Sequence, residues 1–461
     1  MHRTATSIHH QQHRLGTYRA HNDSYHYFNL LTSETLLDKV EALLPEHRER
    51  LYPPTETLSM FLAQAMSADR SCQSIVNQAT VQRLVGGLKT GSTHTGGYCR
   101  ARQRLPLAMI DELTRYIGDL ADQQVLDPWR WQGRRVRIVD GTTVTLADST
   151  ENQQAFPQQC VQQVGLGFPI CRIVGITCLS SGILKNAAIG RYQGKGSDEQ
   201  SLLRSMQDSF ETGDIVLGDA YFATYFFIAE MQRKGVDILM EQHGSRRRTT
   251  DFRLGKRLGQ RDHLLVYPKP KIRPQWMSVE QYDAMPKSLT VRECKTGGKV
   301  LVTTLNCPKT TSKNNLKMLY KNRWHVELDI RNIKTTMGMD TLGCKSPDMV
   351  LKEIWVHLLA YNLIRLMMLQ SALMVDIAPR NISFKHCLQL WLVALNQLNI
   401  LDEEQFCGLL LLMSQQRVGN RPGRIEPRVI KRRPKAFSFL RVTRAEARET
   451  IKKYGHPKKL K

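Results

Sequence analysis

Several motifs that assign proteins to a functional class are missing from this sequence of 461 residues. Its ten cysteines are scattered and none forms a CxxC pair, which removes the usual spacing of zinc and disulfide-exchange sites. We expect reduced thiols that fill core positions, as in the apolar stretch ICRIVGITCL. The glycine-rich stretch GGLKTGSTHTGG lacks the GxxxxGK(S/T) pattern, which argues against a nucleotide-binding loop.

Long apolar runs are also scarce. The longest, residues 354–375, is interrupted by His357, Asn362 and Arg365, so we expect no membrane span. The N-terminal residues include histidines and arginines but no apolar core of a signal peptide, so we expect no secretory signal. A hydrophobic content of 41% and a mean hydropathy of −0.37 are typical of a soluble globular protein, which we expect in the cytoplasm.

Acidic residues are few compared with basic ones. Lysine and arginine together number 66 and aspartate and glutamate 42, which leaves a net charge of +24. Residues 417–461 alone contain 16 basic and 3 acidic residues, a net charge of +13. Such an excess calls for a polyanionic partner. For this tail we favour phosphate binding over the alternative of a disordered, solubilising end.

Residues 1–130 predict an all-helical, basic domain. A helix is expected from Thr32, two more in 54–85 with a break near 67–69, and another after the motif YCRARQRLP. The motif contains Arg100, Arg102 and Arg104. These arginines either contact DNA phosphates or only form a solvated face of the domain, and we favour contact with DNA.

From Trp131 the pattern changes to an α/β order. Alternating, β-branched stretches predict three strands, followed by a helix with Ser197 as its N-cap, a strand, a helix and a strand. This order predicts the first part of an α/β core at 131–243. Residues 244–313 lack helix signals and predict a β-rich insertion, with strands at HLLVYP, LTVREC and KVLVTTL. We expect the core to resume at 314–400, with a helix that starts at Ser346, and a helical, basic tail at 401–461.

Two aspartates stand where the alternation of a strand predicts a core residue. Asp140 is in phase with Val136 and Ile138 and is expected to close the first strand, and Asp219 is expected to close the fourth. An acid at a strand end either caps the following turn or binds a metal ion. The turn alternative stays open for Asp140, which precedes glycine, and is weaker for Asp219, which precedes Ala-Tyr.

A third acid lies in the stretch YKNRWHVELDIRNIK, residues 320–334. On one continuous helix, Tyr320, Arg323, Glu327 and Lys334 fall on a single narrow stripe beside an apolar one. Ordinary ion pairs on a solvated face would explain such a stripe for one helix alone. Carboxylates that converge repel each other unless a cation joins them, and hard cations such as Mg²⁺ take oxygen ligands. Arginine and lysine beside such a site would hold phosphates.

These motifs together resemble the DDE transposases of bacterial insertion sequences, in the group with a Tyr-x2-Arg-x3-Glu-x6-Lys signature. The signature matches without a gap, and the first two acids lie in VDGTTV and LGDAYF, as in that group. The stretches TLSMFLAQAMSADRSC, YCRARQRLP, GLGFPICRIVGI and RPGRIEPRVIKRRPK are also similar. The resemblance extends over about residues 50–440.

The resemblance implies a ribonuclease-H-like catalytic core interrupted by the β-rich insertion, with a helical N-terminal DNA-binding domain. It implies that Asp140, Asp219 and Glu327 are catalytic and bind two Mg²⁺ ions, with Mn²⁺ as a substitute. It implies that Tyr320, Arg323 and Lys334 contact the DNA end. The partners would be double-stranded DNA, as terminal inverted repeats and as target, and a second copy of the chain in a homodimer.

Two other functions compete with cut-and-paste transposition. One is a catalytically inactive, sequence-specific DNA-binding relative that acts as a regulator, which the presence of all three acids argues against. The other is a simple metal-dependent nuclease. Some relatives hold a flipped base on a tryptophan of the insertion, where this chain has one tryptophan, Trp276. A lone loop tryptophan is more often a packing residue, so we leave it out of the site.

Overall fold

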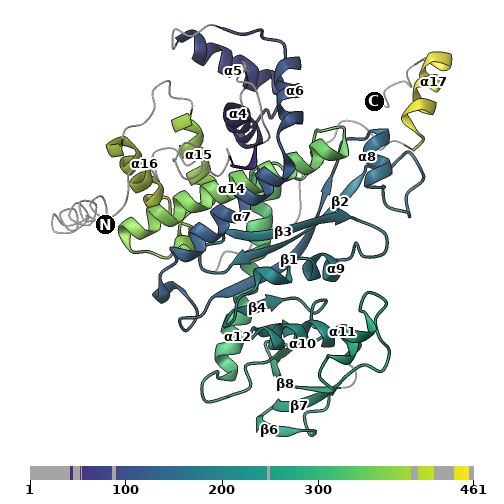
Figure 1. The fold of residues 1–461 in the computed structure, drawn as a ribbon, viewed down its shortest axis with the longest axis vertical. Helices are drawn as coiled ribbons and strands as arrows, with labels where there is room; N and C mark the ends of the chain where they lie inside the picture. The colour runs from purple at the N-terminus through teal and green to yellow at the C-terminus, as the bar shows by residue number, and fades with distance from the viewer. Residues whose placement is uncertain are drawn as a thin grey trace, which may run out of the picture.

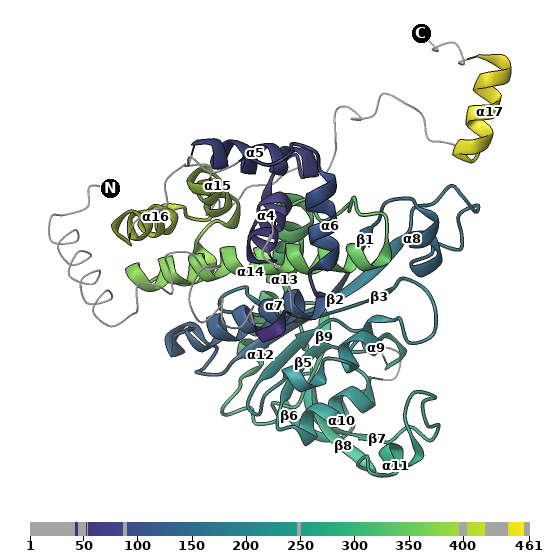
Figure 2. The same cartoon turned by 45° about the horizontal axis from the view of Figure 1, so that its top comes forward.

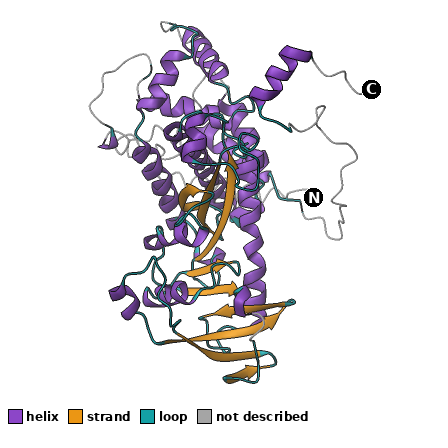
Figure 3. Cartoon of the chain, turned by 90° about the vertical axis from the view of Figure 1, so that its right-hand side faces the viewer, coloured by secondary structure: helices purple, strands orange, loops and turns teal. Residues whose placement is uncertain are grey.

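The computed structural model describes residues 42–44, 52, 54–85, 90–246, 250–395, 403–419 and 441–455. The helix expected from Thr32 falls almost wholly outside these residues, and the RPGRIEPRVIKRRPK stretch of the tail lies entirely outside them. Figures 1 and 2 show helices above a long twisted sheet, and Figure 3 shows the strands reaching the opposite end of the molecule. The architecture is mixed α/β.

The described part of the N-terminal region contains the helices α4 (Pro54–Met66), α5 (Cys72–Val85), α6 (Gly96–Arg104) and α7 (Leu107–Gln123). The sequence predicts α4, α5 and α7 but not α6, which contains most of the YCRARQRLP motif that the last expected helix follows. The break between the first two lies at the expected place. Helices α4 and α7 pack against α14 (Pro347–Val375), so these N-terminal helices share a core with the C-terminal half of the chain.

The nine strands of the described residues belong to one sheet, in the order β3-β2-β1-β4-β5-β9-β8-β7-β6. Their bounds are β1 (Val136–Thr145), β2 (Ile170–Cys178), β3 (Leu184–Arg191), β4 (Ile215–Gly218), β5 (Asp237–Glu241), β6 (Lys256–Gly259), β7 (Asp262–Pro268), β8 (Ser288–Thr296) and β9 (Lys299–Thr303). Strand β1 pairs antiparallel with β2 and parallel with β4, and β4 pairs parallel with β5.

The β-rich segment continues the main sheet, because β9 pairs antiparallel with β5. The sequence predicts three of its four strands and misses β6 and the short helix α11 (Val279–Asp283). Both lie in polar, turn-rich stretches, and α11 begins at a capping box formed by Ser278 and Gln281.

Helices cover both faces of the sheet. The other helices are α8 (Thr150–Ala155), α9 (Glu199–Arg204), α10 (Tyr225–Arg233), α12 (Lys313–Lys321), α13 (His325–Arg331), α15 (Phe384–Leu395), α16 (Glu403–Gln415) and α17 (Arg444–Tyr454). Val139 of β1 packs in the core shared with α9 and α10, whereas Ile138 packs in the core shared with α12 and α13. Alternation along β1 therefore directs Asp140 towards α13.

Two details of the sequence prediction are wrong. Asp140 does not close β1, because pairing with β2 continues from Gly141↔Val174 to Thr145↔Ile170. The parallel pairing with β4, however, does end at Ile138↔Leu217. The N-cap of α9 is Asp198, not Ser197: the Asp198 carboxylate accepts a hydrogen bond from the Ser201 N–H, while the Ser197 hydroxyl donates to the Gly194 carbonyl.

Helix α14 begins after Ser346, as predicted, and forms the centre of the helical layer. It is long and apolar enough to cross a membrane by length and composition, but 89% of its most apolar window is buried inside the structure. The ten cysteines are all free, and Cys171 and Cys178 are buried in the sheet, as predicted. Cys160 and Cys307, however, are exposed, so the prediction of thiols at core positions is wrong for these two.

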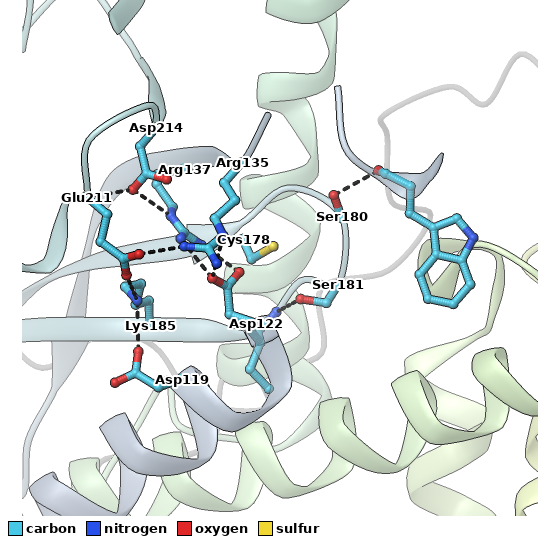
Figure 4. Close-up of polar contacts among 12 residues, drawn as sticks. Asp119, Asp122, Arg135, Arg137, Cys178, Ser180, Ser181, Lys185, Glu211 and Asp214 are labelled. Atoms are coloured by element: carbon cyan, nitrogen blue, oxygen red, sulfur yellow. Dashed lines mark hydrogen bonds and ion pairs between the residues drawn. The ribbon is translucent and has the colours of Figure 1, made fainter. Parts of the chain in front are cut away.

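A buried group of charges ties the first half of β1 to its neighbours (Figure 4). The Arg137 guanidinium donates to both carboxylate oxygens of Asp122 on α7, at 2.7 and 2.8 Å, and to Asp214 before β4, at 3.1 Å. Beside it, Lys185 of β3 pairs with Asp119 and Glu211. These contacts join α7, β1, β3 and the start of β4. They lie at the ends of β1 and β4 that precede Asp140 and Asp219 in the chain.

Candidate active site

Asp140 lies partly buried on the central strand, beside the point where its parallel neighbour ends. Its Oδ1 accepts the Gly141 N–H at 2.9 Å. Burial raises the pKa of this carboxyl to about 6; the Gly141 hydrogen bond and Arg323 lower it, while Asp219 and Glu199 raise it further. A nearby cation would therefore stabilise the ionised form of Asp140, which burial and the neighbouring acids disfavour.

Asp219 directly follows β4, as the sequence predicts. Because β1 and β4 are parallel neighbours, both aspartates lie at the same edge of the sheet. The Asp219 Oδ1 accepts the Tyr221 N–H at 2.8 Å, and its charge acts on both Asp140 and Tyr320. The two aspartates thus lie close enough for the charge of Asp219 to raise the pKa of Asp140.

Glu327 reaches the same place from α13. Arg323 lies between two of the acids: its Nη2 is 2.8 Å from the Glu327 Oε1 and its Nη1 is 3.3 Å from the Asp140 Oδ2. One guanidinium thus bridges the strand acid and the helix acid, and this is the closest convergence of charge at the site.

The helix that carries Glu327 is irregular, contrary to the single continuous helix that the sequence predicts. After α12 a 3-10 turn, η4 (Asn322–Trp324), precedes α13, and a π-helical turn, η5 (Asn332–Thr336), follows it. The π turn changes the direction of Lys334, whose Nζ donates to the Thr143 carbonyl of β1 at 2.7 Å. Lys334 therefore ties the end of this segment to the strand of Asp140.

Tyr320 is 8% exposed, and its hydroxyl has no hydrogen-bond partner within the described part of the chain. Burial is the main cause that raises its pKa to about 12. The residue lines a cavity of about 610 Å³ between α12 and the β8–β9 hairpin, together with Lys299, Lys317, Arg323 and Trp324. This basic and aromatic cavity opens next to the acids.

Glu199, the first residue of α9, is a carboxylate of the site that the sequence did not reveal. A Cβ atom on Gly141 would overlap its carboxyl group, so it lies directly over the backbone next to Asp140. Burial raises its pKa, which Arg172 lowers and Asp219 raises. Its only sequence signal is an acid in the first turn of a helix, which is too common a feature to point to a site.

The donor set fits a hard divalent cation, because the converging groups are carboxylates of low exposure that already hold a guanidinium between them. In the residues that the structure describes, no three Asp, Glu, His or Cys side chains are close enough to ligate one ion. A cation that uses Asp140, Asp219 and Glu327 together therefore requires these acids to draw closer, and it must displace Arg323, which lies between Asp140 and Glu327.

Two other residues considered from the sequence have packing roles. Arg102 is buried, and its guanidinium donates to the Cys72 Sγ at 3.1 Å and the Gln64 Oε1 at 3.3 Å, so the preference for a DNA contact is wrong for this arginine. Trp276 packs under the Arg204 guanidinium, 4.1 Å from its ring centroid, and edge-on to Phe226.

Comparison with known proteins adds a family. Residues 131–363, just over half of the chain, match the family described as "Transposase DDE domain". The chain is 27% identical over 335 residues to the transposase InsG of insertion sequence element IS4 from Escherichia coli, covering 71% of this chain and 69% of that protein. A solved structure of the piggyBac transposase synaptic complex with hairpin DNA is similar at a TM-score of 0.43 and 9% identity, over 87% of this chain and 86% of that one. The matched segment contains Asp140, Asp219 and Glu327, and the chain belongs to the DDE transposase family.

Proposed function

We propose that this protein is the transposase of an insertion sequence, which binds terminal inverted repeats and catalyses metal-dependent cleavage and strand transfer of double-stranded DNA. The observation that carries the proposal is the meeting of Asp140 and Glu327 on Arg323, next to Asp219, inside the family segment. Strands of the order β3-β2-β1-β4-β5 support a ribonuclease-H-like core, with β6 to β9 as the insertion.

We assign the ion to Asp140, Asp219 and Glu327. Bound Mg²⁺, or Mn²⁺ in its place, supplies charge stabilisation at the attacking and leaving oxygens of a phosphodiester. The other residues position the DNA. Arg323, freed from the two acids, is placed to hold a phosphate of the DNA end with its planar fork. Tyr320 lines the same cavity as Arg323, and Lys334 stays close to β1.

We further assign DNA binding to the N-terminal domain, residues 1–130, and to the basic tail within 401–461. Arg100 and Arg104 are exposed on α6, and residues 417–461 of the tail hold +13 of the net charge of +24. The core segments are 131–243 and 314–400. A homodimer that brings two DNA ends together completes the proposal.

The test uses end-labelled DNA that flanks the coding region, with purified protein and either Mg²⁺ or a chelator. The wild-type protein should cut at the tips of inverted repeats in Mg²⁺ only, and Glu327→Gln should bind the same DNA without cutting. Glu151→Gln, an exposed glutamate on α8, is the matched control and should cut as the wild type does. Repeat-specific binding without cutting in any metal would instead favour a regulatory DNA-binding protein.

A further inference from the structure

Asp329, two residues after Glu327 on α13, has the most enclosed carboxylate near the site. Its side chain is fully buried and accepts hydrogen bonds from two arginines. The Nη2 of Arg365 on α14 lies 2.6 Å from the Asp329 Oδ1. Arg380, in the 3-10 turn η6 (Pro379–Asn381), contacts both oxygens, at 2.8 and 2.9 Å. One carboxylate is therefore fixed by two guanidiniums from different elements.

These arginines are themselves bonded to the strand pair that carries Asp140. Arg380 donates to the carbonyls of Leu179 and Cys178 at the end of β2, at 2.6 and 3.1 Å. The Nε of Arg365 donates to the Tyr361 hydroxyl, which in turn donates to the Gly182 carbonyl in the β2–β3 turn. Strand β2 pairs with β1 along its length, including at Asp140↔Gly175. The two arginines that hold Asp329 are thus connected through β2 to β1, the strand of Asp140.

The helix α13 needs such an anchor. It has seven residues and lies between a 3-10 turn and a π turn, so regular helical hydrogen bonding fixes its rotation only weakly. Residues two apart on a helix point in directions about 200° apart. When Asp329 points into the interface with α14, Glu327 must point to the other side, where Arg323 and Asp140 lie.

A buried ion pair is a poor source of stability compared with an apolar group of the same size, and its better attested use is to fix one arrangement of the elements. We propose that Asp329 is a positioning residue for Glu327. Its ion pairs with Arg365 and Arg380 set the rotation of α13 and hold the Glu327 carboxylate where Asp140 can share a cation with it. The inference rests on the proposed function, in which Glu327 is a metal ligand.

Calorimetric titration of Mn²⁺ into the full-length protein without DNA tests it, with melting temperatures measured alongside. Glu327→Gln and Asp329→Asn should both weaken Mn²⁺ binding, by about 10- to 100-fold. The matched control is Asp122→Asn, which removes another buried carboxylate held by a two-pronged arginine contact. It should lower the melting temperature but keep wild-type Mn²⁺ affinity. Affinity for the repeat DNA should be the same in all four proteins.

The outcomes separate the two claims. Wild-type Mn²⁺ affinity in Asp329→Asn, with weak binding in Glu327→Gln, would overturn the positioning role. Equal weakening in Asp122→Asn would also overturn it, because stability alone would then explain the effect. A wild-type protein that binds no Mn²⁺, or a Glu327→Gln variant that binds it normally, would refute the proposed site itself. If Asp329→Asn does not fold, the variant Arg380→Lys replaces it in the test. It keeps the positive charge but loses the two-pronged guanidinium contact, and it should weaken Mn²⁺ binding several-fold. Wild-type Mn²⁺ affinity in Arg380→Lys would overturn the inference.

Discussion

At the scale of single residues, the pKa of Asp140 reflects the charges and the burial of the whole site. Its pKa is raised by burial above all and further by Asp219 and Glu199, whereas Arg323 acts in the opposite direction. A carboxyl in these surroundings is ionised at least cost when a cation lies beside it. Arg323 supplies that cation in the structure, and it does so for Glu327 at the same time.

Removal of Arg323 should therefore help a metal ion to bind in the absence of DNA. We expect Arg323→Gln to tighten Mn²⁺ binding by roughly threefold to tenfold, because the ion no longer competes with two partly exposed ion pairs worth up to about 1 kcal/mol each. Calorimetric titration would measure it. Weaker binding in this variant would mean that Arg323 holds the acids in place for the ion.

Gly141 and Glu199 should be coupled. In Gly141→Ala the new methyl group overlaps the Glu199 carboxyl group, so we expect a loss of roughly 1–3 kcal/mol in the free energy of unfolding. The double variant Gly141→Ala/Glu199→Ala should recover most of that loss relative to Glu199→Ala alone. Chemical denaturation of the four proteins measures the coupling, and simple additivity of the two changes would show that the side chain can move away freely.

At the scale of elements, hydrophobic alternation predicts much of the site. Asp140 shares its phase with Val136 and Ile138, and these pack against the layer of α12 and α13, which is why the strand acid and the helix acid meet. The extent of β1 could not be predicted, because pairing with β2 carries the strand through a glycine that reads as a turn.

Other parts of the site depend on tertiary contacts that leave no local signal. Glu199 joins it only because α9 packs over β2 and β3, which brings the Glu199 carboxyl group to the backbone of Gly141. The π turn at Asn332–Thr336 breaks the stripe expected from helical periodicity, and the bond from Lys334 to the Thr143 carbonyl crosses from helix to sheet. Such features follow from packing and not from the order of polar and apolar residues.

The buried pair of Asp122 and Arg137 joins α7 to β1 and predicts a pH-dependent stability. Burial alone would raise the pKa of Asp122, but hydrogen bonds and the charge of Arg137 outweigh it and lower that pKa. The ionised carboxylate therefore adds stability above its unfolded pKa of about 3.9, and this is lost as the pH falls through the lower folded value.

We expect Asp122→Asn to cost about 3–5 kcal/mol of unfolding free energy at pH 7, the usual effect of breaking a buried pair. The difference from the wild type should shrink when the pH falls below about 4. Urea denaturation of both proteins from pH 7 to pH 3 measures this, and a constant difference would show that the charge of Asp122 contributes nothing to its role.

At the scale of the whole molecule, two features concern DNA binding: the packing of the N-terminal helices on α14 and the net positive charge of the chain. Helices α4 and α7 pack on α14, and α14 holds Arg365, which pairs with Asp329. Helices α4 and α7 are thus linked to the helix of Glu327 through α14 and its ion pair with Asp329. The net charge of +24 gives the chain a long-range attraction for DNA.

Deletion of residues 420–461 should weaken DNA binding in general and not the recognition of one sequence. The segment carries 15 basic and 3 acidic residues. We expect weaker binding to both repeat and unrelated DNA and a flatter dependence of log affinity on log salt concentration. Fluorescence anisotropy at several salt concentrations measures both. An unchanged slope would place the phosphate contacts elsewhere.

Single-turnover cleavage of flanking DNA in Mg²⁺ tests most directly whether Asp140, Asp219 and Glu327 form one site. The variants are Asp140→Asn, Asp219→Asn, Glu327→Gln and the combination of all three. Residues that act as a unit lose function together, so each single variant should be slowed by roughly a thousandfold or more, and the triple variant should be little slower than any one of them. A single variant that cuts within about tenfold of the wild-type rate, or losses that multiply from variant to variant, would contradict a shared metal site.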